Sequence, residues 1–321
     1  MAPAATTTTT SVTETAPLAV LKAQPADKVP EDSKEVTPLE AISHGDILPD
    51  IPAFPSYTAE RRHILIHMAA VFRNWSRMGY AEGQSGHISV RDPEFPQIMW
   101  MNPLSRHYGT LTAGDMIPME IATGRIVGGR PNPRTGTVTG NKAGYFIHSA
   151  IHKRRSDIHA VCHAHTHAGR AWSVFAKPLE MLTQDVCSLY NCHTVYAAYG
   201  GIVFAGEEGE RIAEALGQHN KGAILMNHGL LSVGYTVDEA GFIFGLMERS
   251  CAIQLQVEAA CANGNLKKQY ISDEEAAYNC KMASEKHAMY REMQPDVELE
   301  IQEAGGEEVL ARGFEHLSIA L

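Results

Sequence analysis

The amino-acid sequence predicts a mixed α/β fold, and three local patterns support this prediction. Ile64, Met68, Val71 and Trp75 recur at steps of four, three and four residues, which is the spacing of one apolar helix face. The runs "GHISVRD" and "IMWMNP" are short, β-prone and separated by a turn that contains proline. Helix and strand patterns then alternate over residues 141–165. A chain with these patterns is expected to pack helices against a sheet.

Composition narrows the classes of partner. The chain has 321 residues, with 27 Lys and Arg against 37 Asp and Glu and a formal net charge of −10. This balance disfavours nucleic acid or an anionic membrane and favours a small-molecule substrate. The sequence holds no run of the roughly 18 to 20 apolar residues that a membrane-spanning helix needs, and its start lacks a secretory signal pattern. The six cysteines are scattered and suggest no disulfide framework, so we expect a cytoplasmic protein.

The elements of the first half follow in order. Residues 1–50 are rich in Thr, Pro, Ala and acidic residues without a hydrophobic period, so they are predicted to form a disordered tail. A helix begins near Tyr57, and Gly79 can end it. The two β-prone runs come next. The segment "DMIPMEIATGRIVGG" is expected to form two strand segments around a turn at Thr123 and Gly124.

The second half continues with alternating elements. A helix over "NKAGYFIHSAIHKRR" leads into a strand at "DIHAVCHAH" and then another helix. "GEEGERIAEALGQH" predicts an amphipathic helix, and "KGAILMNHGLLSVG" a buried strand pair or hairpin. The longest helix should begin at a capping box of Thr236 and Glu239 and run to Cys261. A further acidic helix is expected over residues 272–292.

The stretch "AVCHAHTHAG" carries His163 and His165 two residues apart, and "LMNHGLL" carries His228 directly before Gly229. Side chains alternate along a strand, so the first two imidazoles share one face, while small residues fill the other. A turn could direct His228 toward them. Neutral imidazole is a common ligand of zinc, iron, manganese and copper, so the pattern predicts a divalent metal site. The alternative is that these are solvated or hydrogen-bonded structural histidines.

The blocks "HAVCHAHTHAG", "IHSAIHKRRSD" and "ILMNHGLLSVGYTVDEA" together resemble the class II aldolase/adducin family over roughly residues 58–262. The resemblance implies a three-layer α/β/α sandwich with a mostly antiparallel central sheet. It implies a catalytic domain over residues 55–265, with a C-terminal helical extension and tail at 266–321. It also implies a homotetramer and a divalent metal on His163, His165 and His228, with Zn placed first and Fe(II) or Mn as alternatives.

The sequence departs from the sugar-phosphate aldolases of that family at two motifs. Their Ser-Ser-Glu run, which binds phosphate and moves protons, is replaced by Lys142, Ala143 and Gly144. Their Gly-Asn turn becomes "GQSGHISVR", with His87 in place of asparagine. We therefore expect a substrate that is not phosphorylated and carries a carboxylate. The candidate substrate-binding residues are Gln84, Ser85, Gly86 and Arg106.

Another group must replace the missing glutamate in acid/base work, because glycine offers no titratable atom. Asp185, His87 and Lys142 are the candidates. Asp185 follows an expected strand and could instead be a turn or salt-bridge residue, and Lys142 a solvated cation at a helix start. Some relatives deliver a tail tyrosine to the site, for which Tyr278 and Tyr290 are weaker candidates here.

Three functions are weighed. The first is a metal-dependent carbon–carbon lyase, of aldolase or decarboxylase type, acting on a small hydroxy- or oxo-carboxylate. The second is an Fe(II)-dependent oxidative decarboxylase or dioxygenase, as in the relatives from aminocoumarin antibiotic synthesis. The third is an adducin-like protein that binds the actin cytoskeleton. The complete histidine set and the absence of a polybasic run at the end of the chain argue against actin as a partner.

Overall fold

The computed structural model describes residues 36–201 and 206–320, and the segment from Thr37 onward forms one compact unit. The predicted disordered tail falls mostly on residues 1–35, which lie outside the described residues. Within the rest of that predicted tail, Pro38–Ile42 form a short helix, α1, which begins at a capping box between Thr37 and Glu40. No helix in the described part of the chain is long and apolar enough to cross a membrane.

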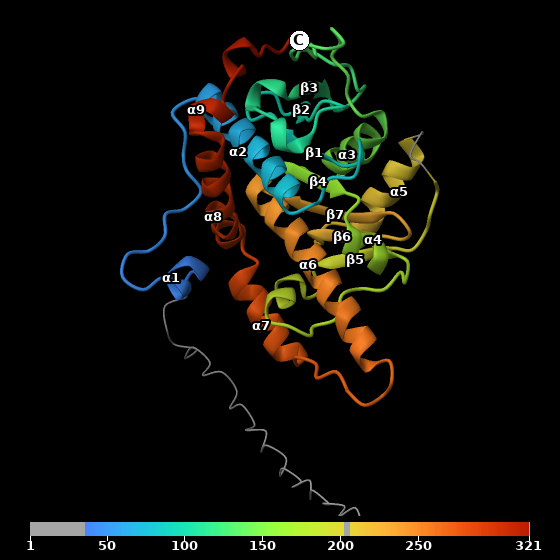
Figure 1. Ribbon diagram of the computed structural model, residues 1–321. Coiled ribbons are helices and arrows are strands. Elements are labelled where there is room, and N and C mark those ends of the chain that lie inside the picture. Colours follow the sequence, from blue (N-terminus) through green and yellow to red (C-terminus); the bar gives the residue numbers. More distant parts are fainter. Residues whose placement is uncertain (1–35, 202–205, 321) are drawn as a thin grey trace, which may run out of the picture. The chain divides into compact units, whose positions relative to one another are not determined.

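The described residues form one sheet of seven strands in the order β3-β2-β1-β4-β7-β6-β5 (Figure 1). The strands are β1 His87–Arg91, β2 Ile98–Met101, β3 Ile117–Glu120, β4 Ala160–Ala164, β5 His193–Tyr196, β6 Gly222–Leu225 and β7 Gly229–Gly234. Neighbouring strands pair antiparallel, except that β5 and β6 run parallel. The predicted mostly antiparallel sheet and the hairpin over residues 221–234 are both confirmed.

Helices cover both faces of the sheet (Figure 1). One face carries α2 (Tyr57–Arg77), α4 (His167–Ser173), α6 (Val237–Cys261) and α8 (Lys286–Ala304), and the other α3 (Lys142–Arg154) and α5 (Gly206–Leu216). Along β4, Cys162 faces the first group and Val161 the second, as strand alternation requires. Trp75 of α2 and Phe244 of α6 pack with ring centroids 4.4 Å apart and join the two helices. The predicted mixed α/β class is confirmed.

Helix boundaries follow from capping groups. The side chain of Ser56 accepts a hydrogen bond from the Ala59 amide at the start of α2, and α2 ends just before Gly79, whose φ of 76° is easy for glycine. Thr236 caps α6 as predicted, by accepting from the Glu239 amide. The Glu239 carboxylate accepts instead from the Tyr235 amide, so the reciprocal half of the predicted capping box is absent.

Two predicted elements differ in the structure. Of the two strand segments expected over residues 115–129, only β3 forms, and the second is reduced to one bridge between Met119 and Ile126. The single helix expected over residues 272–292 is two helices, α7 (Asp273–Ala283) and α8. The break occurs because Glu285 is extended, and its carboxylate accepts from the His287 and Ala288 amides to start a new helix. The remaining elements are α9 Glu307–Leu310, η1 Tyr108–Thr110, η2 Ala113–Asp115, η3 Asp185–Leu189 and η4 Phe314–His316.

Candidate metal centre

The three histidines singled out by spacing lie together at one end of two paired strands. His163 belongs to β4, and His165 follows Ala164, the last residue of that strand. Because β4 pairs with β7, the turn between β6 and β7 lies beside the end of β4, and His228 is in that turn. A Cβ on Gly229 would lie 2.9 Å from the Ala164 carbonyl oxygen, so glycine permits this close approach.

The three imidazoles converge on one point. One ring nitrogen from each of His163, His165 and His228 lies within 4.8 Å of the others, and the ring centroids are 4.7 to 5.1 Å apart. Nitrogen ligands about 2.1 Å from a shared tetrahedral ion would lie roughly 3.4 Å apart. Small side-chain rotations therefore suffice for this group, called the histidine trio below, to hold one metal ion.

The protonation state of the histidine trio suits a metal. Burial lowers the pKa of His163 and of His165, and it lowers the pKa of His228 to about 4, so neutral rings prevail near pH 7. The Nδ1 atom of His163 lies 2.8 Å from the Leu230 carbonyl oxygen, which can only accept a hydrogen bond. Nδ1 therefore carries the hydrogen, and the lone pair is on Nε2, as in metal-ligating histidines.

A buried carboxylate fixes the segment that follows His165. Glu248 of α6 accepts hydrogen bonds from the hydroxyl of Thr166 and from the amides of Ala168 and Gly169, the latter two at 2.9 and 2.7 Å. These bonds tie the start of α4 to α6 and hold His165 at its place beside the strand. No local sequence pattern indicates this role for Glu248, because its partners are about 80 residues away along the chain.

His87, one of the predicted acid/base candidates, lies beside the histidine trio. It is paired in register with His163 on the neighbouring strand, and the two ring centroids are 5.0 Å apart. Its ring also lies against Gly144 of α3, where a Cβ would come within 2.6 Å of the His87 Cδ2 atom. Glycine at position 144 thus leaves the space that the His87 imidazole fills. Burial lowers the pKa of His87 well below its usual range.

A buried row of hydrogen bonds continues from His87 away from the histidine trio. The Nδ1 atom of His87 lies 2.7 Å from Nε2 of His148, and Nδ1 of His148 lies 2.6 Å from the Ser89 hydroxyl. The same hydroxyl is 2.9 Å from Nε2 of His152. His148 and His152 are four residues apart on a helix, and His87 and Ser89 two apart on a strand, so both pairs face each other. His148 and His152 were not among the predicted site residues, although their i, i+4 spacing places them on one helix face.

The predicted loop of Gln84, Ser85 and Gly86 is also close to the histidine trio. A Cβ on Gly86 would lie 3.1 Å from the Cα of Ala164, the residue between His163 and His165. The Tyr108 hydroxyl donates a 2.9 Å hydrogen bond to the Ser85 carbonyl and fixes the loop from behind. Gly86 has a φ of 95°, which glycine adopts without strain.

The other predicted site residues lie in different surroundings. Arg106 pairs with Asp115, which also binds Arg130, so two guanidinium groups share one carboxylate. Lys142 is exposed at the first position of α3, and its ammonium lies 6.0 Å from the Phe146 ring centroid. Asp185 was expected to follow a strand, and this prediction is wrong. It begins the 3-10 helix η3 and is exposed. The difference arises because residues 177–184 form bends and turns without strand pairing.

The two candidate tail tyrosines differ in burial. Tyr278 of α7 is 45% exposed, whereas Tyr290 of α8 is buried, and burial raises the pKa of its hydroxyl. Within this chain, Tyr290 stacks toward His67 of α2 with ring centroids 6.3 Å apart, so it serves helix packing.

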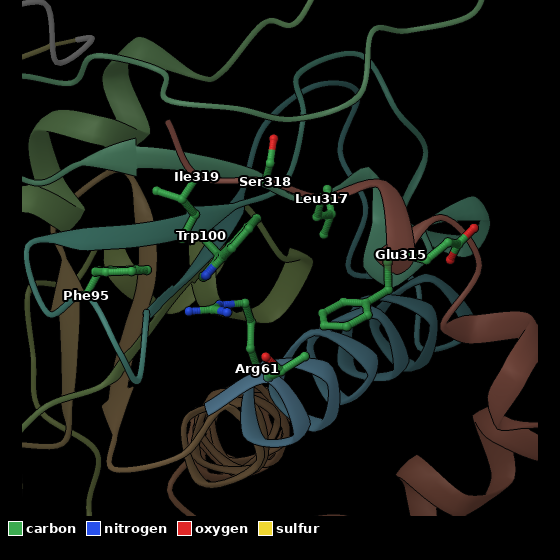
Figure 2. Close-up of a pocket in the computed structure, with 9 residues that line it drawn as sticks. Arg61, Phe95, Trp100, Glu315, Leu317, Ser318 and Ile319 are labelled. Carbon is green, nitrogen blue, oxygen red and sulfur yellow. The ribbon is translucent and has the colours of Figure 1, made fainter. Parts of the chain in front are cut away.

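A separate cavity of about 320 Å³ lies between the start of α2, the turn after β1 and the C-terminal tail. Figure 2 shows Arg61 reaching toward Phe95 and Trp100, with Leu317 and Ile319 of the tail on the other side. Asp92 and Glu94 already bind the Arg61 guanidinium. The cavity therefore offers no free cation and contains none of the histidine trio.

The fold and the site define a class: a mixed α/β protein in which a strand and a hairpin turn bring together imidazoles that can hold a metal ion. The family model "Class II Aldolase and Adducin N-terminal domain" matches residues 66–255, and the chain belongs to this family. Its predicted family membership is thereby confirmed.

Three proteins are similar to this chain in sequence. The chain is 35% identical over 257 residues to the Meiotically up-regulated gene 14 protein of Schizosaccharomyces pombe, covering 80% of this chain and 96% of that one. It is 39% identical to a 4-hydroxy-3-prenylphenylpyruvate oxygenase/4-hydroxy-3-prenylbenzoate synthase of Streptomyces roseochromogenus, covering 65% and 73%. It is 38% identical to Decarboxylase NovR of Streptomyces niveus, covering 65% and 75%.

A solved structure and a cytoskeletal relative complete the comparison. L-fuculose 1-phosphate aldolase from Glaciozyma antarctica superimposes with a TM-score of 0.72 at 33% identity, covering 79% of this chain and 95% of that one. Rat alpha-adducin is 29% identical over 225 residues, but the match covers only 29% of its length. Family members thus include proteins named as aldolases, as decarboxylases and as adducins.

Proposed function

We propose that the protein is a metal-dependent enzyme that cleaves a carbon–carbon bond of a small oxo- or hydroxy-carboxylate, by an aldolase-type or decarboxylase-type reaction. The observation that carries this proposal is the convergence of three neutral imidazole nitrogens beside His87. His163, His165 and His228 would hold the ion, with Zn placed first and Fe(II) or Mn as alternatives. The ion would supply a Lewis acid that stabilises negative charge developing on a substrate oxygen.

His87 moves the proton in this proposal. Its Nδ1 atom is engaged with His148, so Nε2 is the atom left to exchange a proton with substrate. The ring is neutral near pH 7 because burial lowers its pKa, so it has an unprotonated nitrogen, while the same lowering makes that nitrogen a weaker base. The row through His148 and Ser89 holds the ring in place. Lys142 and Asp185, the other candidates, are exposed and have less support.

Substrate binding is assigned to the loop of Gln84, Ser85 and Gly86. The loop lies against Ala164 and so borders the histidine trio. Backbone amides in a tight glycine turn can receive an anion, and a substrate carboxylate is of the right charge. Lys142 and Ala143 stand where the aldolase motif has its two serines, which supports a substrate without the phosphate that those serines bind. Arg106 contributes only if a carboxylate displaces Asp115 from it.

The experiment combines metal analysis with product release. Protein purified without chelator is loaded with Zn, Mn or Co and incubated with a panel of 2-oxo and 2-hydroxy acids, and pyruvate and carbon dioxide are measured. His163→Ala is expected to lose bound metal and product release together. His219→Ala, at an exposed position after α5, is the matched control and should keep both. Full activity of the His163→Ala protein would refute the metal role.

A comparison of three variants tests the proton-transfer group. His87→Asn, Lys142→Ala and Asp185→Asn are assayed with the best substrate of the panel. General acid/base groups typically contribute about 100-fold to 10,000-fold in rate, and we expect the loss in kcat to be confined to His87→Asn. A comparable loss in Lys142→Ala or Asp185→Asn would transfer the role to that residue.

A second function is oxidative decarboxylation with Fe(II) and oxygen. The observation that favours it is the 39% identity to a protein named as an oxygenase of a prenylated phenylpyruvate, which is a 2-oxo acid. Three neutral nitrogen ligands with open positions also suit Fe(II). Aerobic and anaerobic assays of iron-loaded protein separate the two functions, because a lyase needs no oxygen. Oxygen uptake in step with carbon dioxide release would establish the second function over the first.

Assembly and location are part of the proposal. Val174 and Phe175, directly after α4, are 56% and 53% exposed, and such an exposed apolar pair favours contact with another copy. We expect a cytoplasmic homo-oligomer, a tetramer, which light scattering of the purified protein tests. Binding to actin has less support, because the adducin match covers under a third of that protein. Cosedimentation of the protein with actin filaments would support binding to actin.

A further inference from the structure

Two thiols far apart in sequence lie in contact beside the start of β5. Cys192 directly precedes β5, and Cys280 is in the last turn of α7, which packs against η3 (Figure 1). Their Sγ atoms are 3.7 Å apart, although the residues are 88 positions apart. We propose that Cys192 and Cys280 form a reversible disulfide, a modification site that ties the C-terminal extension to the sheet when the protein is exposed to peroxide.

The two sulfur atoms are close enough for this bond to form after the side chains rotate. A disulfide requires the sulfur atoms to be about 2.05 Å apart, so they must approach by about 1.7 Å, which is within the range of side-chain rotation. The backbone of Cys192 is fixed on both sides: its amide donates to the Leu189 carbonyl at 3.0 Å, and its carbonyl accepts from the Lys221 amide at 2.7 Å. The two side chains are therefore held in position to react.

The surroundings of the two sulfurs divide the roles between them. Cys280 is hydrogen-bonded to the Cys192 thiol and lies 3.3 Å from the Ser284 hydroxyl. The hydrogen bond from Cys192 lowers the pKa of the Cys280 thiol against the opposing effect of burial, and Lys221 adds a favourable charge. The pKa of Cys192 is correspondingly raised, first by the same hydrogen bond. Because its sulfur also lies beside the Ser284 hydroxyl and near the positive charge of Lys221, Cys280 is assigned as the nucleophile and Cys192 as the resolving thiol.

A metal site at the same place is excluded by the neighbouring histidine. His193 adjoins Cys192 in sequence, but both of its ring nitrogens are engaged. Nδ1 donates to the Leu189 carbonyl at 2.8 Å, and Nε2 accepts from the Leu179 amide at 2.9 Å. Cys187, a third thiol nearby, donates to the Thr183 carbonyl at 3.4 Å. The pair of sulfurs is therefore left to thiol chemistry.

The reaction balances with hydrogen peroxide as the oxidant. The Cys280 thiolate attacks one peroxide oxygen, the O–O bond breaks, and a sulfenic acid and hydroxide form. The Cys192 thiol then attacks the sulfenic sulfur, the S–O bond breaks, and hydroxide leaves and takes up the Cys192 proton as water. The net change is two thiols and one peroxide to one disulfide and two waters, and an added dithiol reverses it. Cys192 is partly exposed and Cys280 retains 9% exposure, so a molecule as small as peroxide has access.

The experiment maps the bond in the full chain. Protein is treated with a small excess of hydrogen peroxide, its remaining thiols are alkylated, and it is digested without reduction for mass spectrometry. Trypsin leaves Cys187 and Cys192 in one peptide, because no Lys or Arg lies between Lys177 and Arg211. Chymotrypsin cleaves after Tyr190 and separates them. We expect a linked pair of peptides containing Cys192 and Cys280, which dithiothreitol releases.

Variants distinguish this pair from the other thiols. Cys192→Ser should stop the reaction at a Cys280 sulfenic acid, which dimedone traps, and Cys280→Ser should abolish the linked peptides. Cys187→Ser and Cys261→Ser are the matched controls and should form the bond normally. Oxidation should raise Tm of the wild-type chain by at least about 3 °C, because an 88-residue loop is closed, and should leave Cys192→Ser unchanged. A Cys187–Cys280 bond, a disulfide between two chains, or alkylation of both Cys192 and Cys280 after peroxide would each overturn the proposal.

Discussion

Two clusters of histidines in this protein have opposite surroundings. In the histidine trio, the ring nitrogens converge on one another, and the bond from His163 to a backbone carbonyl leaves a lone pair directed inward. The second cluster, His63 and His67 on α2, has ring centroids 3.8 Å apart. Here Nδ1 of His67 lies 2.6 Å from the carboxylate of Asp238, which also accepts a 2.9 Å hydrogen bond from Gln294.

The difference shows what determines the role of an imidazole. A spacing of four on a helix is as suitable for a metal as a spacing of two on a strand, so His63 and His67 could have been ligands by spacing alone. What faces them is a buried carboxylate that is already hydrogen-bonded and joins α2, α6 and α8. The second cluster therefore holds helices together, whereas no hydrogen bond or ion pair among the described residues joins the histidine trio to a carboxylate.

The largest expected effect separates the two clusters by metal content. His228→Ala should lower metal affinity by at least about 100-fold, because only two of the three imidazole ligands remain. His67→Ala should leave the metal content unchanged, provided that the variant is measured below its unfolding temperature. Inductively coupled plasma mass spectrometry after dialysis gives the metal bound per chain. Equal loss of metal in both variants would show that the comparison is wrong.

The second prediction concerns stability, and here the variant of the second cluster should have the larger effect. His67→Ala leaves the buried Asp238 carboxylate with Gln294 alone, and removing one partner of a buried pair costs about 3 to 5 kcal/mol of unfolding free energy. His165→Ala, whose ring is only partly buried, should cost about 1 kcal/mol or less in the metal-free protein. Urea unfolding monitored by tryptophan fluorescence measures both. A smaller loss for His67→Ala than for His165→Ala would contradict the structural role of the second cluster.

The sequence could predict the histidine trio because each part is local. Strand alternation places His163 and His165, and a glycine after His228 permits the close turn. His148 and His152 could not be recognised in the same way, because their role depends on which strand lies under α3. The helix carries the i, i+4 spacing, but the partners His87 and Ser89 are set by tertiary packing.

Local sequence patterns also predicted most elements of the fold. The helix over Tyr57–Arg77, the hairpin and the longest helix follow from apolar periodicity and caps that the sequence displays. The break between α7 and α8 was not predicted, because an acidic residue can lie inside a helix or cap its N-terminus. Glu285 caps the N-terminus of α8. The contact of Cys192 and Cys280 depends on how α7 packs, so no spacing rule could have indicated it.

The third prediction concerns acid stability and the row that links the site to α3. Burial, and secondarily Arg91, lowers the pKa of His152 to about 3 in the folded chain, against an ordinary value of 6.5. The unfolded chain takes up the proton first, so stability is fully present above about pH 6.5 and is lost as pH falls toward 3. The loss from one such histidine is about 1.4 kcal/mol per pH unit within that window. Urea unfolding at a series of pH values gives the dependence of the unfolding free energy on pH. This dependence should be weaker for His152→Gln than for the wild-type chain, and an unchanged dependence would refute the assignment.

The smallest expected effect tests the close fit between His87 and α3. In Gly144→Ala, the new Cβ would lie 2.6 Å from His87 Cδ2, so the ring or the helix must move. Overpacking of this kind costs about 1 to 3 kcal/mol, and it should displace His87 from His163 and lower kcat while metal content stays constant. Gly206→Ala is the matched control, because among the described residues its Cβ would meet nothing closer than 3.9 Å. If Gly144→Ala keeps wild-type stability and kcat, the site tolerates a side chain there, and the absence of a carboxylate at position 144 is not enforced by His87.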